Sequence, residues 1–231
     1  MPPYVVRGCV AADGAALAYN NISAFWTDPT YVLLWENKTR EYMIEQASKR
    51  YPKTLLTDRD HRRHQVAVDS ETGKVVGYSR WILPVRLTSE WPDAQTPAAS
   101  DQEEKEYTKS FESADWSGRP GMDEIDVPVT AIKKRLLELK EYMILDYLAV
   151  HPDNGGRGIG TMLVESGIAQ AERMGVDIFV LAYKAGLGVY FRLGFKLLEQ
   201  LIQDDSKYGG QGEYGAYFLE KEVQKGSSSC G

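Results

Sequence analysis

Residues 142–160 read YMILDYLAVHPDNGGRGIG and contain the pattern that decides the fold. The first part, Tyr142–Val150, is apolar apart from Asp146 and predicts a central β-strand. From Gly158 to Met174 apolar residues recur at roughly helical spacing, and Gly175 stands where a left-handed residue commonly ends a helix. The segment therefore predicts a strand, a glycine-rich turn and a helix in immediate succession.

The glycine-rich turn is suited to binding an anion. Glycines let several backbone N–H groups converge, and the helix dipole adds partial positive charge at the same place, so a pyrophosphate would fit. A Walker P-loop needs Lys followed by Ser or Thr after its last glycine, whereas Thr161-Met162 stands here. A Rossmann fingerprint needs another glycine spacing and a place near the first strand. A purely structural turn is the remaining alternative, although such a turn needs fewer glycines.

The flanking sequence predicts an α/β domain around this segment. Before the segment, the predicted elements are a strand Tyr4–Val10, a helix reaching Trp26, a helix capped by Asp28 and running towards Arg50, and a hairpin of Gln65–Val68 with Lys74–Leu83. After it come a strand Asp177–Leu181, a helix Ala185–Leu193, and strands Phe195–Ile202 and Tyr214–Leu219. This order predicts one domain with a mixed, twisted sheet and helices on both faces.

A long polar insertion separates the hairpin from the central strand. It spans about residues 85–128 and contains one acidic helical piece, Gln102–Glu112, before a helix at Val129–Leu139. Connections this long are often binding loops or lids. We expect the domain to cover residues 1–224 and residues 225–231 to form a flexible tail.

Composition excludes several classes of protein. The 231 residues carry a net charge of -6 and no broad basic stripe, so nucleic acid is not expected as a partner. No apolar run is long enough for a membrane span, and no secretory signal is visible, so we expect a cytoplasmic protein. Cys9 and Cys230 make no disulfide framework, and the three histidines have no ligand spacing, so no metal is expected.

Two motifs resemble the GNAT superfamily of N-acetyltransferases. The first is the strand ending Leu148-Ala149-Val150, followed by Pro152 and the glycine turn; the second is Gly188–Phe195, reading GVYFRLGF, which is similar to the family's helix-to-strand segment. The resemblance covers about residues 142–195. It departs from the family pattern at Gly155, where Arg or Gln is usual, so a charged contact to phosphate is missing. The backbone donor of Gly155 and the side chain of Arg157 are the expected replacements.

The resemblance implies acetyl-CoA as the co-substrate. Backbone groups at the end of the central strand would bind the thioester carbonyl and the pantetheine, and the turn would bind the pyrophosphate. The residues implied are Leu148, Ala149, Val150, Gly155, Gly156, Arg157, Gly158, Ile159, Gly160 and Thr161.

Tyr190 and Asp146 are the candidate catalytic residues. Tyr190 occupies the family's tyrosine position, from which a phenol can protonate the departing thiolate; a buried core tyrosine is the alternative. Asp146 is the only ionisable residue in the central strand, and period-2 geometry would place it on the face of Leu148 and Val150. It is interpreted as a general base or a substrate anchor, with a structural role left open.

The acceptor is expected to be the primary amine of a small molecule or amino-acid-like compound. The family's acceptor pocket lies beside the first helices, where Trp26 and Tyr31 are candidate lining residues together with Asp146. Other aromatic residues near this junction are expected to be packed in the core. A non-catalytic acyl-CoA sensor and a protein or peptide N-acetyltransferase are the alternatives. A homodimer is possible.

Overall fold

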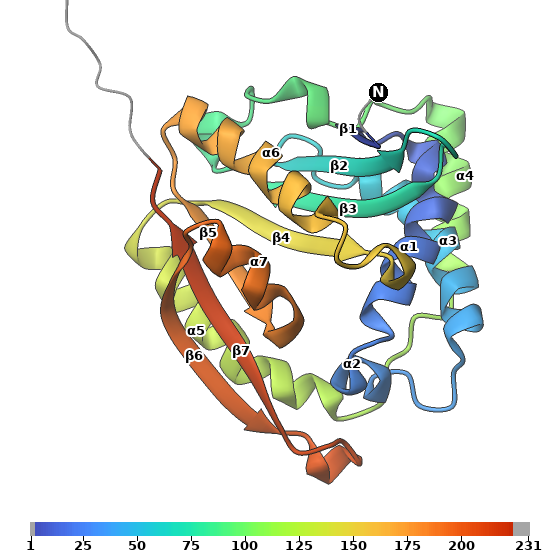
Figure 1. The fold of residues 1–231 in the computed structure, drawn as a ribbon. Coiled ribbons are helices and arrows are strands. Elements are labelled where there is room, and N and C mark those ends of the chain that lie inside the picture. Colours follow the sequence, from blue (N-terminus) through green and yellow to red (C-terminus); the bar gives the residue numbers. More distant parts are fainter. Residues whose placement is uncertain (1–2, 224–231) are drawn as a thin grey trace, which may run out of the picture.

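The computed structural model describes residues 3–223, which form one α/β unit (Figure 1). The predicted flexible tail at 225–231 lies outside the described residues. The mixed sheet with helices on both faces is confirmed. The elements are β1 (Tyr4–Gly8), α1 (Gly14–Phe25), α2 (Pro29–Leu33), α3 (Arg40–Leu56), β2 (Arg62–Asp69), β3 (Val75–Ile82), α4 (Asp101–Glu112), α5 (Asp126–Leu139), β4 (Met143–Val150), α6 (Ile159–Met174), β5 (Ile178–Tyr183), α7 (Leu187–Arg192), β6 (Lys196–Asp204) and β7 (Glu213–Lys221).

The seven strands form one sheet in the order β1-β2-β3-β4-β5-β7-β6, in which only β4 and β5 are parallel neighbours. Their pairing is short: it joins Met143–Leu145 to Ile178–Val180 and then stops. Beyond this point β4 runs on towards α1 while β5 continues beside β7 (Figure 1). The two central strands thus separate at their carboxyl ends and leave unpaired backbone there.

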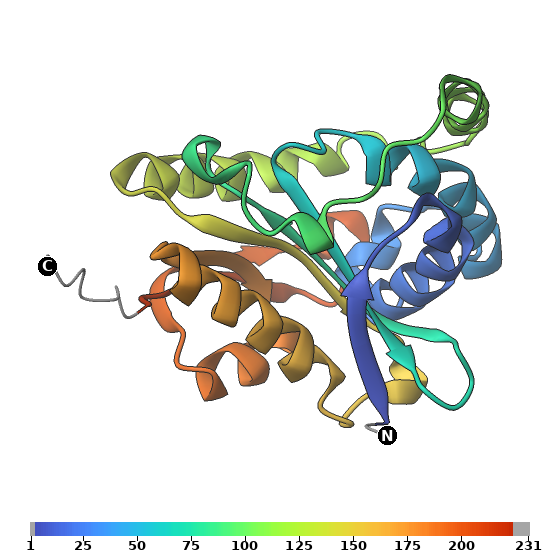
Figure 2. The ribbon, with the colours of Figure 1, turned by 90° about the horizontal axis from the view of Figure 1, so that it is seen from above.

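Helices cover the two faces of the sheet in separate groups (Figure 2). On one face α6 and α7 pack over Trp81, Leu145 and Val180. On the other face α5 covers Phe179 and Phe218, and α1 with α3 covers the half formed by β2 and β3. The core therefore consists of two apolar layers on either side of the sheet.

Close contacts between α6 and the sheet depend on two glycines. A Cβ on Gly167 would lie 2.0 Å from the indole of Trp81, and one on Gly77 would lie 2.7 Å from the side chain of Ile159. Larger residues at these positions would push the helix away from the strands. The start of α6, which carries the glycine turn, is therefore held at a fixed height above β3 and β4.

The helix predicted from Asp28 towards Arg50 is in fact two helices. Asp28 does cap α2, since its Oδ1 accepts hydrogen bonds from the backbone of Thr30 and Tyr31, but α2 ends at Leu33. Asn37 has a left-handed backbone with φ of 62°, and the Thr39 side chain then caps α3. Residues 36–41, ENKTRE, are all polar and include the capping residue Thr39, so a local signal for this break was present in the sequence.

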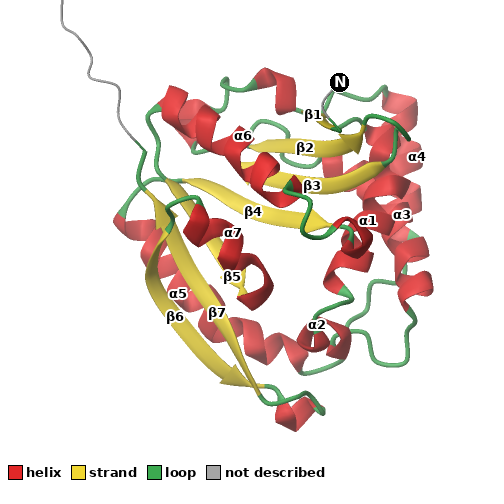
Figure 3. Cartoon of the chain, viewed as in Figure 1, coloured by secondary structure: helices red, strands yellow, loops and turns green. Residues whose placement is uncertain are grey.

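The insertion between β3 and β4 folds against the rest of the domain (Figure 3). Its helix α4 agrees with the acidic helix expected at Gln102–Glu112, and the Arg50 guanidinium of α3 lies 3.9 Å from the ring centre of Phe111. Helix α5 begins at Asp126 instead of Val129, with Pro128 in its first turn. The insertion therefore adds a covering helix to the sheet and brings the start of α5 close to α2.

Candidate active site: two connected pockets

A cleft of about 480 Å³ follows β4 from the point where β5 leaves it. The glycine turn forms one end, and α7 forms a side wall. Seven of the residues expected to bind acetyl-CoA line it: Leu148, Ala149, Val150, Gly155, Gly156, Ile159 and Gly160. Both candidate catalytic residues, Asp146 and Tyr190, line the same cleft. The structure therefore brings together residues that the sequence separates by more than forty positions.

The glycine turn presents a series of free backbone donors. Gly156 and Gly158 have φ of 72° and 78°, a conformation that a residue with a side chain rarely adopts. Within residues 3–223, the N–H groups from Gly156 to Thr161 have no hydrogen-bond acceptor. These donors lie where the α6 dipole favours negative charge, so the turn fits the pyrophosphate of a nucleotide cofactor.

Two details of the predicted phosphate site need correction. The N–H of Gly155 is not free, because it donates to the carbonyl of Pro152 at 3.0 Å. The Arg157 side chain does not line the cleft: it lies beside the hydroxyl of Tyr4 and near Asp69, and both raise the pKa of its guanidinium. The donors that remain are the main-chain N–H groups from Gly156 onwards, which include those of Gly158 and Thr161 although neither residue lines the cleft.

The end of β4 is held by a buried asparagine of α1. Asn20 is fully buried; its Nδ2 donates to the carbonyl of Ala149 at 3.3 Å, and its Oδ1 accepts from the N–H of His151 at 3.0 Å. His151 in turn stacks on Tyr19, with ring centres 4.8 Å apart. The two hydrogen bonds of Asn20 therefore hold the backbone of Ala149 and Val150 in place. This is the segment expected to bind the thioester end of the co-substrate.

Tyr190 is buried but is not an ordinary core tyrosine. It is 4% exposed and packs edge-on against Phe195, yet its hydroxyl has no hydrogen-bond partner among the described residues. Burial raises the pKa of its phenol, so the hydroxyl stays protonated at neutral pH. A protonated hydroxyl without a protein partner, facing a cleft, is available to donate to a bound ligand.

Asp146 does not share a face with Leu148, contrary to the expected alternation. The register of β3 with β4 shifts between Arg80 and Trp81, which pair with Tyr147 and Leu145 and leave Asp146 without a partner in the ladder. This bulge turns the carboxylate towards Arg80, whose Nε donates to Oδ2 at 2.8 Å, while Leu148 packs on the α6 side. Lys133 of α5 lies 3.6 Å from the other carboxylate oxygen.

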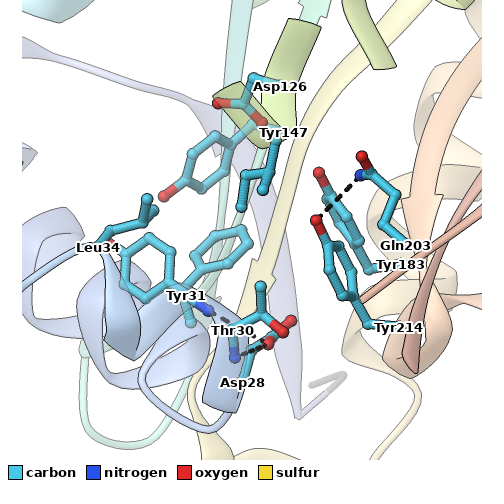
Figure 4. A pocket seen from close by; sticks show the side chains of 11 residues that line it. Asp28, Thr30, Tyr31, Leu34, Asp126, Tyr147, Tyr183, Gln203 and Tyr214 are labelled. Atoms are coloured by element: carbon cyan, nitrogen blue, oxygen red, sulfur yellow. Dashed lines mark hydrogen bonds between the residues drawn. The ribbon is translucent and has the colours of Figure 1, made fainter. Parts of the chain in front are cut away.

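A second, smaller pocket opens from this cleft on the α2 side (Figure 4). Its volume is about 170 Å³, and it shares Phe25, Asp28, Tyr147 and Tyr183 with the cleft. The rings of Tyr183 and Tyr214 face Tyr31 and Leu34 across it in Figure 4. We call it the acceptor pocket; its lining residues are Phe25, Asp28, Thr30, Tyr31, Leu34, Ile125, Asp126, Tyr147, Tyr183, Gln203 and Tyr214.

Of the three residues expected to bind the acceptor, only Tyr31 lines this pocket. Trp26 does not line the pocket; its ring packs edge-on against Tyr31, with ring centres 6.4 Å apart. Asp146 lines the larger cleft instead. The sequence analysis missed Tyr147, Tyr183 and Asp126. A tyrosine at the carboxyl end of a strand beside the crossover was a usable signal for Tyr183, because ligands commonly bind there. Nothing in the local sequence pointed to Asp126.

Hydrogen bonds tie together the segments that form the acceptor pocket. Thr30 of α2 donates to Asp205 in the β6–β7 connection at 2.7 Å. Arg119 of the insertion donates to the carbonyl of Tyr208 at 2.7 Å, and the Tyr208 hydroxyl donates to the carbonyl of Gly121 at 2.8 Å. Lys207 pairs with Glu124 at 2.9 Å, so the insertion and the β6–β7 connection act as one border of the pocket.

The geometry agrees with the family comparison. Residues 25–195 match the family model described as acetyltransferase (GNAT) family. The chain therefore belongs to the GNAT acetyltransferase family and is an acetyl-CoA-dependent acyltransferase. The sensor alternative raised by the sequence analysis is thereby set aside.

Solved structures share this fold at low sequence identity. One is described as histone acetyltransferase HPA2 and related acetyltransferase from Corynebacterium glutamicum, with TM-score 0.58, 19% identity, and coverage of 97% of this chain and 99% of that one. The PaiA N-acetyltransferase of Thermoplasma acidophilum in complex with coenzyme A gives TM-score 0.53 and 13% identity over 95% and 99% of the two chains. The polyamine N-acetyltransferase of Drosophila melanogaster gives TM-score 0.54 and 14% identity over 95% and 100%. A search of curated protein sequences gave no match.

Two structural findings concern a membrane and a metal. Among residues 3–223, no helix is both long and apolar enough to cross a bilayer. In the same range no group of three His, Cys, Asp or Glu side chains is arranged to hold a metal ion.

Proposed function

We propose that this enzyme transfers the acetyl group of acetyl-CoA to the primary amine of a small molecule. The observation that carries the proposal is the size of the acceptor pocket: at about 170 Å³ it matches a group of roughly ring size, since a cavity of about 150 Å³ holds benzene. A protein acceptor needs an open groove beside the reacting amine. In this chain Ile125 and Asp126 of the insertion form part of the wall of the acceptor pocket, where such a groove would have to run.

The two pockets bind the two substrates: the cleft binds acetyl-CoA, and the acceptor pocket binds the amine. The free N–H groups from Gly156 to Thr161 bind the pyrophosphate, and the unpaired edge of β4 at Leu148–Val150 directs the thioester towards the junction with the acceptor pocket. An amine entering from Tyr31 then meets the thioester at this junction. Orientation of two bound reactants is the first contribution such a site makes to the rate.

The chemistry is direct transfer. The amine nitrogen forms a bond to the acetyl carbon, the carbon–sulfur bond breaks, the sulfur takes a proton, and the nitrogen loses one. Tyr190 donates to the sulfur. Because burial raises the pKa of Tyr190, full proton transfer costs more than for a free phenol, and hydrogen-bond donation to the developing thiolate is its main role.

Asp146 is our candidate for receiving the proton from the amine. It lines the cleft with Tyr190, and its second oxygen lies 3.6 Å from Lys133 while the first is bonded to Arg80. If Asp146 is the base, Asp146→Asn lowers turnover and changes the pH–rate profile. An unchanged profile at normal rate assigns Asp146 to holding Arg80 and removes it from proton transfer.

The test of the function is thiol release from acetyl-CoA with a panel of amines, amino acids and peptides, after acetyl-CoA binding has been measured by calorimetry. We expect binding and turnover with at least one small amine. Peptide turnover faster than that of every small amine would instead favour protein acetylation, the activity in the name of the histone acetyltransferase structure from Corynebacterium glutamicum.

A further inference from the structure

The acceptor pocket combines aromatic walls with negative charge. Five of its eleven lining residues are aromatic, two are aspartates, and none is Lys, Arg or His. Figure 4 shows the two carboxylates, Asp28 and Asp126, at opposite ends of the group of rings. A pocket of this composition suits a cation, which gains both carboxylate contacts and the attraction of the ring faces.

The two carboxylates have unused acceptor capacity. Asp28 uses Oδ1 to cap α2, while its Oδ2 has no partner among the described residues. Asp126, at the start of α5, is exposed and has neither a hydrogen bond nor an ion pair to any residue in the described range. Both lie close enough to Tyr183 to raise the pKa of its phenol, in addition to the effect of burial, so they border the same space.

The neighbouring cations are already committed to other carboxylates. Lys133 lies in the adjoining cleft against Asp146. Lys207 pairs with Glu124 at 2.9 Å, on the outer border of the pocket. Among residues 3–223, Asp126 therefore has no ion-pair partner, and its pKa is raised by burial and by nearby Asp123.

We propose that the acceptor is a dication, in which the reacting primary amine is joined by a short alkyl chain to a second ammonium or guanidinium group bound between Asp28 and Asp126. This inference rests on the proposed function and narrows its substrate class. The reacting end lies at the junction with the cleft, near Tyr147, and the distal cation lies among the rings of Tyr31, Tyr183 and Tyr214. A volume of about 170 Å³ accommodates a tail of about six non-hydrogen atoms.

The test compares acceptors of matched size. Cadaverine and hexylamine have the same number of non-hydrogen atoms and differ in a terminal ammonium against a methyl group, while aminohexanoate places a negative charge at the distal end. We expect kcat/KM for cadaverine to exceed that for hexylamine by about 10- to 100-fold, the range for a hydrogen bond to a charged group. Agmatine should behave like cadaverine, and aminohexanoate should be the poorest acceptor.

Variants of the two aspartates test whether the preference for a dication arises in the acceptor pocket. In Asp126→Asn and Asp28→Asn, kcat/KM for cadaverine should fall by about tenfold more than kcat/KM for hexylamine, so that the preference for the dication falls by the same factor. Asn retains the cap of α2, which protects the fold in the second variant. Asp123→Asn is the matched control, because it removes an acidic charge from a neighbouring exposed residue outside the lining and should leave the preference intact.

The outcomes separate this inference from the proposed function. If hexylamine is acetylated as well as cadaverine, or if Asp123→Asn changes the preference as much as Asp126→Asn, the enzyme is a small-amine acetyltransferase and the dication inference is wrong. If acetyl-CoA binds but peptides alone are acetylated, both proposals fail. Binding of cadaverine to the complex with CoA, measured by calorimetry and weakened in Asp126→Asn, would support the inference independently of turnover.

Discussion

The two pockets of the active site are built by different means. The co-substrate end consists of backbone groups in one continuous stretch, in which the residues from Gly156 to Thr161 supply free donors. The acceptor pocket consists of side chains from α1, α2, the insertion, β4, β5, β6 and β7. A site made from consecutive backbone groups can be recognised in a sequence, whereas a site assembled from seven distant segments cannot.

The two pockets also differ in how much they depend on the side chains of this particular chain. The glycine turn can bind a pyrophosphate in any chain with this backbone conformation, because few side chains take part. The acceptor pocket depends on the particular tyrosines and aspartates of this chain, and its border depends on the insertion. Changes to the co-substrate end should therefore alter the affinity for acetyl-CoA, and changes to the acceptor pocket should alter KM for the amine.

The largest effect is expected from a negative charge in the glycine turn. Gly156→Asp should raise the dissociation constant of acetyl-CoA by 100-fold or more, an order of magnitude set by the loss of charged hydrogen bonds of about 1.5–3 kcal/mol each. Gly156→Asn is the control, since both residues tolerate the positive φ of 72° about equally and only one is charged. Calorimetry measures both. Equal affinities in the two variants would mean that the turn does not bind the phosphates.

Tyr190→Phe should lower kcat by about 100-fold, the lower end of the range for a positioned proton donor, and leave the acetyl-CoA affinity within about twofold. Tyr142→Phe is a suitable control, because Tyr142 is also buried but donates to Glu220 away from the cleft. Steady-state kinetics with saturating amine measure the effect. Since burial raises the pKa of Tyr190, the wild-type profile should show no alkaline limb from this residue below about pH 10. A normal kcat in Tyr190→Phe would remove the hydroxyl from the mechanism.

The buried His64 predicts acid sensitivity of the fold. It is fully buried beside Tyr78, and burial, with nearby Arg80, lowers its pKa to about 3. The unfolded chain, with a histidine pKa of about 6.5, then binds more protons between pH 6.5 and 3, so the free energy of unfolding should fall by about 1.4 kcal/mol per pH unit as pH decreases through that window.

Urea unfolding at pH 7, 6 and 5 measures this slope. His64→Gln should reduce it, and His61→Gln is the control, because His61 is partly exposed and lies next to the carbonyl of Leu83 outside the buried core. An unchanged slope in His64→Gln would show that other groups cause the acid sensitivity.

The smallest effect is expected at the border of the acceptor pocket. Arg119→Ala removes the hydrogen bond to the Tyr208 carbonyl and should raise KM for the amine by about three- to tenfold, the range for one net hydrogen bond. The acetyl-CoA affinity should not change. Arg135→Ala, which removes a surface ion pair with Glu199, serves as the control. A loss of acetyl-CoA affinity in Arg119→Ala would mean that the two pockets are not independent.

Most elements of the fold were predictable because their signals are local. The boundaries of α6 and the hairpin of β2 and β3 followed from periodicity, glycines and turns within each segment. Two errors have different causes. The polar run at residues 36–41 was a local signal for the break at Asn37, whereas the bulge at Asp146 lies within an uninterrupted strand pattern and has no local signal.

The candidate site, like the fold, was predictable where its signals are local. Tyr190 and the glycine turn lie in motifs and were found together in the cleft. Two other features depend on how distant elements pack. Asp146 contacts Arg80 because of the packing of β3, and Asp126 lines the acceptor pocket because of the packing of the insertion. Such long-range placement has no local signature, and the role of the insertion became visible only in the folded chain.

The most direct test of the account is a crystal structure of the enzyme with CoA. We expect that the pyrophosphate accepts hydrogen bonds from N–H groups between Gly156 and Thr161, and that the sulfur lies near Tyr190 at the opening of the acceptor pocket. CoA bound away from β4, or with its sulfur far from Tyr190, would contradict the claim that one continuous site joins the glycine turn to the acceptor pocket.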